Sequence, residues 1–382
     1  MTSETPSIGP VALRSALRRL LGVPETRCDL EPEKRGRVEL DRVVVEKWVL
    51  TAEPGSRIPL TLYRPREILG RLPAVVLTCG HGDSKGVAHM TYVAQTYARI
   101  GLACLLADPL GEEERNAKGE IRTRAHDAPD VAYRAELAGR SVMGKFVFDS
   151  MRGFDLLESL DWIDPHRLGV IGNSLGGAVA GWLFALEPRL RMTVISGWGF
   201  SDSLCARGKH CTRVPNQKLR AICGWDQYLR LGAEHGALLV MNGDSDTVID
   251  SDGSGVVWRD TEANLGSADP GQERLGAWFC PGGGHRPYQG YKDALLFSER
   301  QLGPLGLGSG AFEALPELNF GEWCDRHDIE LEDLYGTELH YRGATLPDLE
   351  LRPVPRQRLA VLKDDEVGGP DFTIDGWLET VG

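Results

Sequence analysis

From residue 74 onward, short apolar runs alternate with longer stretches in which apolar residues recur at helical spacing. Each run is almost continuously apolar, which is typical of a parallel strand buried on both faces. Between the runs, residues 131–160 and 176–186 show the helical pattern. The alternation predicts an α/β protein with a mostly parallel central sheet and helices on both faces. The predicted strands are residues 74–78, 102–107, 168–171, 192–196, 237–241 and 277–280.

The residues before this region have a different pattern. Residues 10–22 place apolar side chains on one side at helical spacing, and the segment ends in Gly22, which predicts a short amphipathic helix. Residues 37–50 and 57–64 are rich in Val, Ile, Leu and Thr, and a Pro-Gly pair separates them. They predict an N-terminal antiparallel hairpin.

Two segments interrupt the strand-helix alternation. Residues 199–235 follow a predicted strand and favour a small cap insertion. Residues 303–310 are rich in glycine and predict a linker, and the residues beyond them have no role that the pattern indicates. We therefore expect an N-terminal helical segment over 1–35, the main α/β domain over 36–302, and a C-terminal extension over 303–382.

Composition narrows the class of protein. Hydrophobic residues make up 42% of the 382 residues, which is enough for a sizeable core. The net charge of −12 argues against nucleic acid or an anionic membrane as a partner, because both would be repelled. No apolar run approaches the roughly 20 residues that span a bilayer. The N-terminus shows no secretory signal, so we expect a cytoplasmic protein.

The eight cysteines are scattered, and three of them lie in predicted strands, which favours reduced, buried thiols. Cys205, His210 and Cys211 lie close together in the sequence. Their spacing matches no familiar zinc pattern, and a fourth ligand is not evident. We therefore expect no metal site.

The strongest chemical signal is the segment 172–176, Gly-Asn-Ser-Leu-Gly, which lies between an apolar strand and a helix of small residues. This arrangement is typical of a nucleophile elbow, where glycines leave room for a serine on a strained turn. The amide of Leu175, at the start of the helix, would face the oxyanion of a substrate. Ser174 is therefore the candidate nucleophile of a serine hydrolase with the α/β-hydrolase fold.

A second oxyanion donor is expected in the loop after an earlier strand of this fold. Residues 79–83, Cys-Gly-His-Gly-Asp, occupy that loop. The backbone amide of Asp83 is our candidate, and Gly82 is the alternative. His81 is expected to organise the loop, because a catalytic histidine before the serine would have the wrong chain order for this fold.

The remaining catalytic groups are expected after later strands. A carboxylate at a rigid strand end can orient a histidine, and Asp246 is the best candidate, with Asp244 and Asp250 as rivals. His285 ends a glycine loop after the last predicted strand, and glycines permit the imidazole to reach the serine. The order Ser174, Asp246, His285 is the order expected for α/β-hydrolases.

With these residues, the chain resembles the bacterial α/β-hydrolases of the acetyl-xylan-esterase-like or dienelactone-hydrolase-like type over roughly residues 10–300. One departure is the run of three glutamates at 112–114, where the family often has Gln-Gly-Glu. Arg140, Asp149 and Arg152 are expected to form buried ion pairs that brace the helix before the elbow. The matching segments are 79–82 (Cys-Gly-His-Gly), 108–115 (Asp-Pro-Leu-Gly-Glu-Glu-Glu-Arg), 139–141, 149–153, 172–177 and 243–246.

The resemblance implies a serine esterase that acts on acyl esters, often acetylated sugars, with neither a metal nor an organic cofactor. A peptidase or amidase, or a carbon-carbon bond hydrolase, would use the same catalytic groups, and a non-catalytic binding protein on this scaffold is a third hypothesis. Trp198 and Trp225 are candidates for lining the acyl or sugar pocket, and a core role is the alternative. The expected partner is a small-molecule or carbohydrate ester, not nucleic acid or membrane, and homo-oligomerisation is left open.

Overall fold

The computed structural model describes residues 8–207, 212, 218–306, 309–331 and 336–382. His210 and Cys211, considered above as metal ligands, lie outside the described residues. The strands are β1 (Glu33–Glu39), β2 (Val43–Glu53), β3 (Ser56–Pro65), β4 (Leu72–Thr78), β5 (Ala103–Ala107), β6 (Ile163–Asn173), β7 (Leu190–Ser196), β8 (Ala237–Gly243), β9 (Leu275–Cys280), β10 (Glu317–Asn319) and β11 (Thr345–Pro347).

Nine of these strands form one sheet in the order β1-β2-β3-β5-β4-β6-β7-β8-β9. The pairs β1–β2, β2–β3 and β3–β5 are antiparallel, and every pair from β5 through β9 is parallel. All six predicted parallel strands are present, and so is the antiparallel hairpin, which is formed by β2 and β3. The predicted α/β-hydrolase sheet is confirmed.

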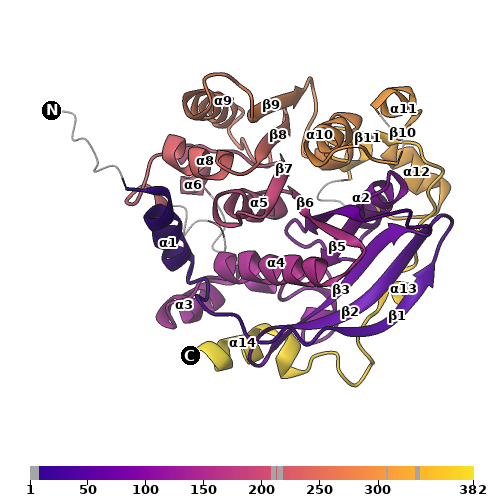
Figure 1. The fold of residues 1–382 in the computed structure, drawn as a ribbon, viewed down its shortest axis with the longest axis horizontal. Helices are drawn as coiled ribbons and strands as arrows, with labels where there is room; N and C mark the ends of the chain where they lie inside the picture. Colours follow the sequence, from indigo (N-terminus) through magenta and orange to yellow (C-terminus); the bar gives the residue numbers. More distant parts are fainter. Residues whose placement is uncertain (1–7, 208–211, 213–217, 307–308, 332–335) are drawn as a thin grey trace.

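Helices cover both faces of the sheet (Figure 1). One hydrophobic core lies under α1, α4, α5, α8 and α9, and a second lies under α2 and α10 on the other face. The helices are α1 (Pro10–Leu21), α2 (Ala88–Arg99), α3 (Pro129–Leu137), α4 (Val142–Ser159), α5 (Leu175–Leu186), α6 (Asp202–Arg207), α8 (Trp225–Ala233), α9 (Val256–Ala268), α10 (Lys292–Leu302), α11 (Ser309–Ala314), α12 (Phe320–Arg326), α13 (Arg356–Leu359) and α14 (Ile374–Val381).

Two predicted elements are each split in the structure. The strand predicted over 37–50 is two strands, β1 and β2, joined by a turn in which Arg42 has a φ of 54°. The helix pattern over 131–160 is two helices, α3 and α4, because Gly139 has a φ of 70° between them. Ser141 then caps α4 by accepting a hydrogen bond from the Gly144 amide at 2.9 Å. Hydrophobic periodicity continues across both breaks, so it does not reveal them.

The C-terminal residues pack onto the main domain and form no separate core. Phe312, Phe320 and Trp323 join the core on the α2 side of the sheet. The Tyr92 hydroxyl of α2 donates to the Pro347 carbonyl at 2.7 Å, which ties α2 to β11. At the other end of the tail, Trp377 of α14 is 1% exposed and joins the core on the α4 side. The tail therefore contacts both faces of the molecule (Figure 1).

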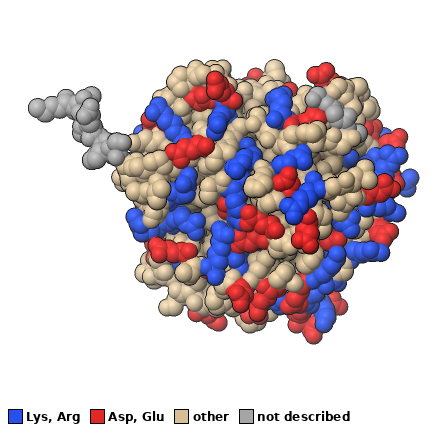
Figure 2. Space-filling model, in the orientation of Figure 1, with Lys and Arg blue, Asp and Glu red and all other residues tan. Residues whose placement is uncertain are grey.

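The surface carries both signs of charge. On the face seen in Figure 2, Lys and Arg side chains intermingle with Asp and Glu side chains. None of the helices in the described part of the chain is long and apolar enough to cross a membrane.

Candidate active site

Ser174 lies on a sharp turn between β6 and α5. Its backbone has a φ of 58° and a ψ of −120°, a conformation that side-chain-bearing residues rarely adopt. The Ser174 amide donates to the Ser196 carbonyl of β7 at 2.9 Å, and the Ser174 carbonyl accepts from Ala178 at 3.0 Å. The turn is thus fixed at both ends, and this is the geometry of a nucleophile elbow.

The glycines beside the serine are required by space. A Cβ on Gly172 would lie 2.2 Å from Thr78 Oγ1, and one on Gly176 would lie 2.1 Å from the Thr78 carbonyl oxygen. Real Cβ atoms essentially never come so close, so β4 can approach the elbow only where these positions lack side chains. The Gly-x-Ser-x-Gly pattern is therefore explained by packing against Thr78.

His285 and Asp246 are in direct contact. His285 Nδ1 lies 2.7 Å from Asp246 Oδ2, and both side chains are fully buried. The other carboxylate oxygen, Oδ1, accepts hydrogen bonds from the amides of Val248 (3.0 Å) and Ile249 (3.1 Å). Two backbone donors thus fix the carboxylate while it holds one ring nitrogen of the histidine.

The rival aspartates contact other groups. Asp244 Oδ1 accepts from the Gly282 amide at 2.8 Å, and Asp250 Oδ2 accepts from the Gly255 amide at 2.6 Å. Of the three aspartates, Asp246 is the one whose carboxylate contacts His285 Nδ1. The structure therefore brings together the aspartate and the histidine that the sequence favoured.

Ser196 holds the histidine loop next to the elbow. Its hydroxyl oxygen lies 2.8 Å from Asn173 Oδ1 and 2.9 Å from the Arg286 carbonyl oxygen, and it accepts from the Tyr288 amide at 3.0 Å. A Cβ on Gly197 would lie 2.7 Å from His285 Cε1 and 2.9 Å from Asn173 Oδ1. The imidazole therefore lies beside the residue that precedes Ser174.

The two predicted oxyanion donors differ in their surroundings. Leu175 is the first residue of α5, so its amide has no partner within the helix. The Asp83 amide donates to the Gly80 carbonyl at 3.2 Å, and Asp83 Oδ2 accepts from the Gly80 amide at 3.1 Å. Asp83 Oδ2 also lies 3.2 Å from His89 Nε2. The turn 80–83 is thus closed by its own hydrogen bonds.

Buried ion pairs brace the helix before the elbow, as predicted, although the partners were not specified by sequence. Asp149 of α4 pairs with Arg115 at 2.7 Å and with Lys145 at 2.8 Å. Arg140 pairs with Glu53 at 2.6 Å, and Arg152 pairs with Asp155 at 2.7 Å. Burial raises the pKa of Asp149, but the positive charges of Lys145 and Arg115 lower it by more, so the pKa lies below its usual value.

A second buried charge cluster fixes the glutamate run. Lys85 Nζ lies 2.5 Å from both Asp108 Oδ2 and Glu114 Oε2. Glu112 accepts from the amides of Thr123 (3.1 Å) and Arg124 (2.7 Å), while burial raises its pKa to about 7. The run that departs from the family pattern is therefore structural, since its carboxylates hold surrounding loops.

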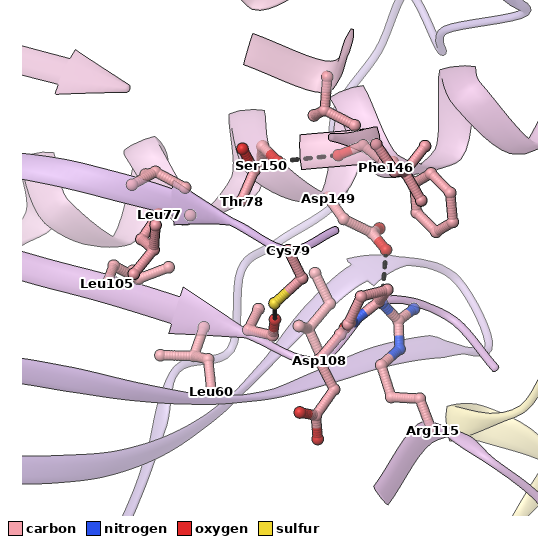
Figure 3. Close-up of a pocket in the computed structure, with 17 residues that line it drawn as sticks. Leu60, Leu77, Thr78, Cys79, Leu105, Asp108, Arg115, Phe146, Asp149 and Ser150 are labelled. Atoms are coloured by element: carbon pink, nitrogen blue, oxygen red, sulfur yellow. Dashed lines mark hydrogen bonds and ion pairs between the residues drawn. The ribbon is translucent and has the colours of Figure 1, made fainter. Parts of the chain in front are cut away.

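A small cavity of about 50 Å³ lies between these ion pairs and the sheet. Figure 3 shows the residues that line it. Cys79 and Leu175 line it beside Asp108 and the Arg115–Asp149 pair. A water molecule needs roughly 10–15 Å³ of such volume, so the cavity has room for a few waters and none for a sugar. The substrate must bind elsewhere.

A cavity of about 550 Å³ is lined by Asp83 of the proposed oxyanion loop and by Tyr341, whose hydroxyl contacts Asn173, while Ser174, Asp246 and His285 are not among its lining residues. We call it the active-site cavity because it lies against that loop. Residues within 81–91, including the proposed oxyanion loop, form one wall. Arg122 and Arg124 form a second wall, and burial lowers the pKa of Arg122. The tail forms the third with residues from 327–331, Tyr341 and 353–355. The volume is that of a site for a small organic molecule.

The two predicted pocket tryptophans do not line this cavity. Trp225 packs against Phe200 and Tyr228 with ring centroids 5.8 Å away in each case, and its indole nitrogen donates to Asp202 at 3.0 Å. Trp198 belongs to the same hydrophobic core. These contacts agree with the alternative, a core role, because both rings are packed in the hydrophobic core.

Sequence reasoning missed the contribution of the tail. Tyr341 lies 168 residues from Asn173 in the chain, yet its hydroxyl accepts from Asn173 Nδ2 at 2.6 Å. Its ring also stacks on His285, with centroids 6.2 Å apart and an interplanar angle of 11°. No motif or spacing links residues 341 and 173, so only the folded chain reveals the contact.

The described residues contain no group of three or more His, Cys, Asp or Glu side chains placed to hold a metal ion. Cys205, the described member of the candidate metal cluster, is buried in the hydrophobic core. Burial raises the pKa of its thiol to about 12, which keeps it protonated and a poor ligand at neutral pH.

Comparison with known proteins gives a family match and several structural relatives. The model of the acetyl xylan esterase family (AXE1) matches residues 25–200. The Bacillus subtilis (strain 168) protein YtaP, described as a candidate hydrolase, is 25% identical over 217 residues, which cover 54% of this chain and 67% of that protein.

Two solved structures resemble this one at low identity. A methylesterase superposes with a TM-score of 0.61 at 15% identity, covering 97% of this chain and 72% of that one. Acetyl xylan esterase 1 from Thermoanaerobacterium sp. JW/SL YS485 superposes with a TM-score of 0.52 at 17% identity, covering 76% of this chain and 93% of that one. These superpositions confirm the fold, and the family match agrees with the acetyl-xylan-esterase-like resemblance over residues 25–200.

Proposed function

We propose that this chain, which has the α/β-hydrolase fold, is an esterase with a serine mechanism. The match of residues 25–200 to the acetyl xylan esterase family supports this proposal. In this proposal Ser174 is the nucleophile, His285 is the general base and Asp246 orients the histidine. The observation that carries the proposal is the buried contact of 2.7 Å between His285 Nδ1 and Asp246 Oδ2, beside a strained elbow serine.

The mechanism follows from these positions. His285 Nε2 takes the hydroxyl proton of Ser174 as Ser174 Oγ attacks the ester carbonyl. The buried Asp246 carboxylate stabilises the imidazolium that forms. Collapse of the tetrahedral intermediate expels the alcohol, which takes the proton from His285, and leaves an acyl-enzyme. Water activated by His285 then releases the acid.

We assign the oxyanion to two backbone amides. The Leu175 amide points from the first turn of α5, where the helix dipole favours negative charge. The Asp83 amide is the second donor. Its bond to Gly80, at 3.2 Å, is long, and the amide exchanges that partner for the oxyanion when substrate binds.

We propose acetyl esters of sugars as the substrates, bound in the active-site cavity with the sugar towards Arg122, Arg124 and the tail. The cavity volume of about 550 Å³ and its charged and imidazole-bearing walls support a polar substrate of this size. This assignment replaces Trp198 and Trp225 as the substrate-contacting residues, because those rings pack in the core. We further propose that the enzyme works in the cytoplasm.

A panel of substrates tests the proposal. Purified enzyme should hydrolyse p-nitrophenyl acetate and acetylated sugars, and it should leave aminoacyl-anilides intact. A fluorophosphonate probe should label the native protein and leave Ser174→Ala unlabelled. Turnover of anilides alone would support the amidase alternative, and an unlabelled native protein would support a non-catalytic scaffold.

A further inference from the structure

Residues 336–343 of the tail, which we call the tail loop, form hydrogen bonds with the segment that carries the proposed catalytic histidine. The Gly284 amide donates to the Leu339 carbonyl at 2.7 Å. The Arg286 guanidinium donates to the carbonyls of Glu338 (2.8 Å), Leu339 (3.0 Å) and His340 (3.2 Å). Both neighbours of His285 are therefore bonded to the tail loop.

The contact is close enough to demand glycine. A Cβ on Gly284 would lie 2.4 Å from the Leu339 carbonyl oxygen and 2.6 Å from His340 Nδ1. The sequence predicts that the glycines before His285 let the imidazole reach the serine. Gly284 has a second effect in the structure. It lets the tail loop approach the histidine segment directly.

His285 itself is held from two sides. Its backbone amide donates to His340 Nδ1 at 2.9 Å. Its ring lies nearly parallel to that of Tyr341, whose hydroxyl accepts from Asn173, the residue before Ser174. Tyr341 is 3% exposed, so it bridges the histidine and the elbow from within the protein.

We propose that His340 and Tyr341 are positioning residues that keep the imidazole of His285 aligned with Ser174. The inference rests on the proposed function, since it assigns these residues to the base of that mechanism. The loop 281–284 contains three glycines and cannot restrict the histidine by itself. A misplacement of about 1 Å in a catalytic group can cost about 100-fold in rate, so an external support has a measurable effect.

The protonation state of His340 agrees with this geometry. Nδ1 accepts a hydrogen bond only when it carries no proton. Burial lowers the pKa of His340, and the charges of His285 and Arg286 lower it further, while Asp246 raises it. The lowered pKa favours the neutral ring of His340, which is the form whose Nδ1 can accept the hydrogen bond from the His285 amide.

Four substitutions test the proposal. His340→Leu removes the acceptor, and we expect kcat to fall about 100-fold with KM little changed. His340→Asn places an amide oxygen where Nδ1 lies, so it should retain kcat within a few-fold of native. Tyr341→Leu should lower kcat more than Tyr341→Phe, which keeps the stacked ring. The acid limb of the kcat–pH profile should change in His340→Leu.

Arg342→Gln is the matched control from the same loop. Arg342 forms ion pairs with Asp325 on α12 and with Glu338, and neither partner is a residue of the proposed triad. It should keep native kcat, and because an exposed ion pair contributes only about 0–1 kcal/mol, it should change the thermal midpoint little. Fluorophosphonate labelling rates, measured in parallel, report the activation of Ser174 without reference to any ester, so failure of the ester assignment is distinguished from failure of this inference.

Native kcat and labelling in His340→Leu would overturn the role of His340. Equal losses in His340→Asn and His340→Leu would do the same, because they would show that general packing and not the acceptor matters. A loss of activity that follows the thermal midpoint across all variants, Arg342→Gln included, would assign the tail loop to stability alone.

Discussion

Asp244, Asp246 and Asp250 follow β8 within a few residues, and at the scale of the residue their hydrogen bonds distinguish them. Asp246 contacts His285, whereas the other two accept from loop amides. The sequence could place the acid after this strand, because buried strands ending in turns are visible as a pattern. It favoured Asp246 but left Asp244 and Asp250 as rivals, since the choice depends on which side chain points at a loop 39 residues away.

We therefore expect Asp246→Asn to lower kcat by about 10⁴-fold, since the amide cannot stabilise the imidazolium and favours the wrong tautomer. Asp244→Asn is the matched control and should keep kcat within a few-fold. Both are measured as steady-state hydrolysis of p-nitrophenyl acetate. A larger loss in the control than in Asp246→Asn would reassign the triad acid.

His126 gives the molecule a specific acid sensitivity. Burial lowers its pKa to about 4, and its Nδ1 lies 3.1 Å from the Leu110 carbonyl. Because the pKa in the folded state lies below the usual 6.5, the stability that the neutral ring contributes is present above about pH 6.5. It is lost as the pH falls towards 4, by roughly 3 kcal/mol.

His126→Asn keeps a donor near the Leu110 carbonyl and does not titrate. Urea unfolding from pH 7 to pH 4 should show a smaller loss of stability in this variant than in the native protein. Parallel loss in the two proteins would mean that other groups account for the acid sensitivity.

At the scale of the element, each predicted parallel strand was found because burial on both faces leaves a continuous apolar run. The sequence missed the breaks within two predicted elements, at Arg42 and at Gly139. At both positions the backbone turns while the pattern of apolar residues continues. The elbow was predictable for the opposite reason, since its two glycines are imposed by contact with Thr78. The tail loop was not predictable, because its contacts join residues with no local pattern.

Two glycine-to-alanine variants should separate these cases. Gly176→Ala places a Cβ 2.1 Å from the Thr78 carbonyl oxygen. We therefore expect this variant to lose activity and its thermal midpoint to fall by several degrees. Gly266→Ala, inside α9, meets nothing within 4 Å and should stabilise by about 0.5–1 kcal/mol with native activity. Differential scanning calorimetry and ester hydrolysis measure both, and a neutral Gly176→Ala would contradict the packing explanation.

At the scale of the whole molecule, the expected boundary at 302/303 does not separate two cores. Glu114 accepts from the amides of Val361 and Leu362, and Trp377 packs near Arg140 and Lys145. Tail and main domain therefore share buried charge as well as apolar surface. We expect them to unfold together.

Trp377→Ala should lower the unfolding free energy by about 3–5 kcal/mol and shift one cooperative transition. Leu69→Ala is the control, because Leu69 is 96% exposed and its loss should change little. Guanidinium unfolding followed by fluorescence and by circular dichroism checks both. Two separate transitions would show that the tail folds by itself.

The contacts between the tail loop and His285 also have a consequence for the synthesis of the protein. Ribosomes synthesise a chain from its N-terminus, so Ser174, Asp246 and His285 all emerge before His340 and Tyr341. The proposed centre is therefore supported only after residues 340 and 341 have been made, and a chain terminated between the proposed triad and residue 340 should be a poor catalyst. Full activity would then report that synthesis had passed residue 341.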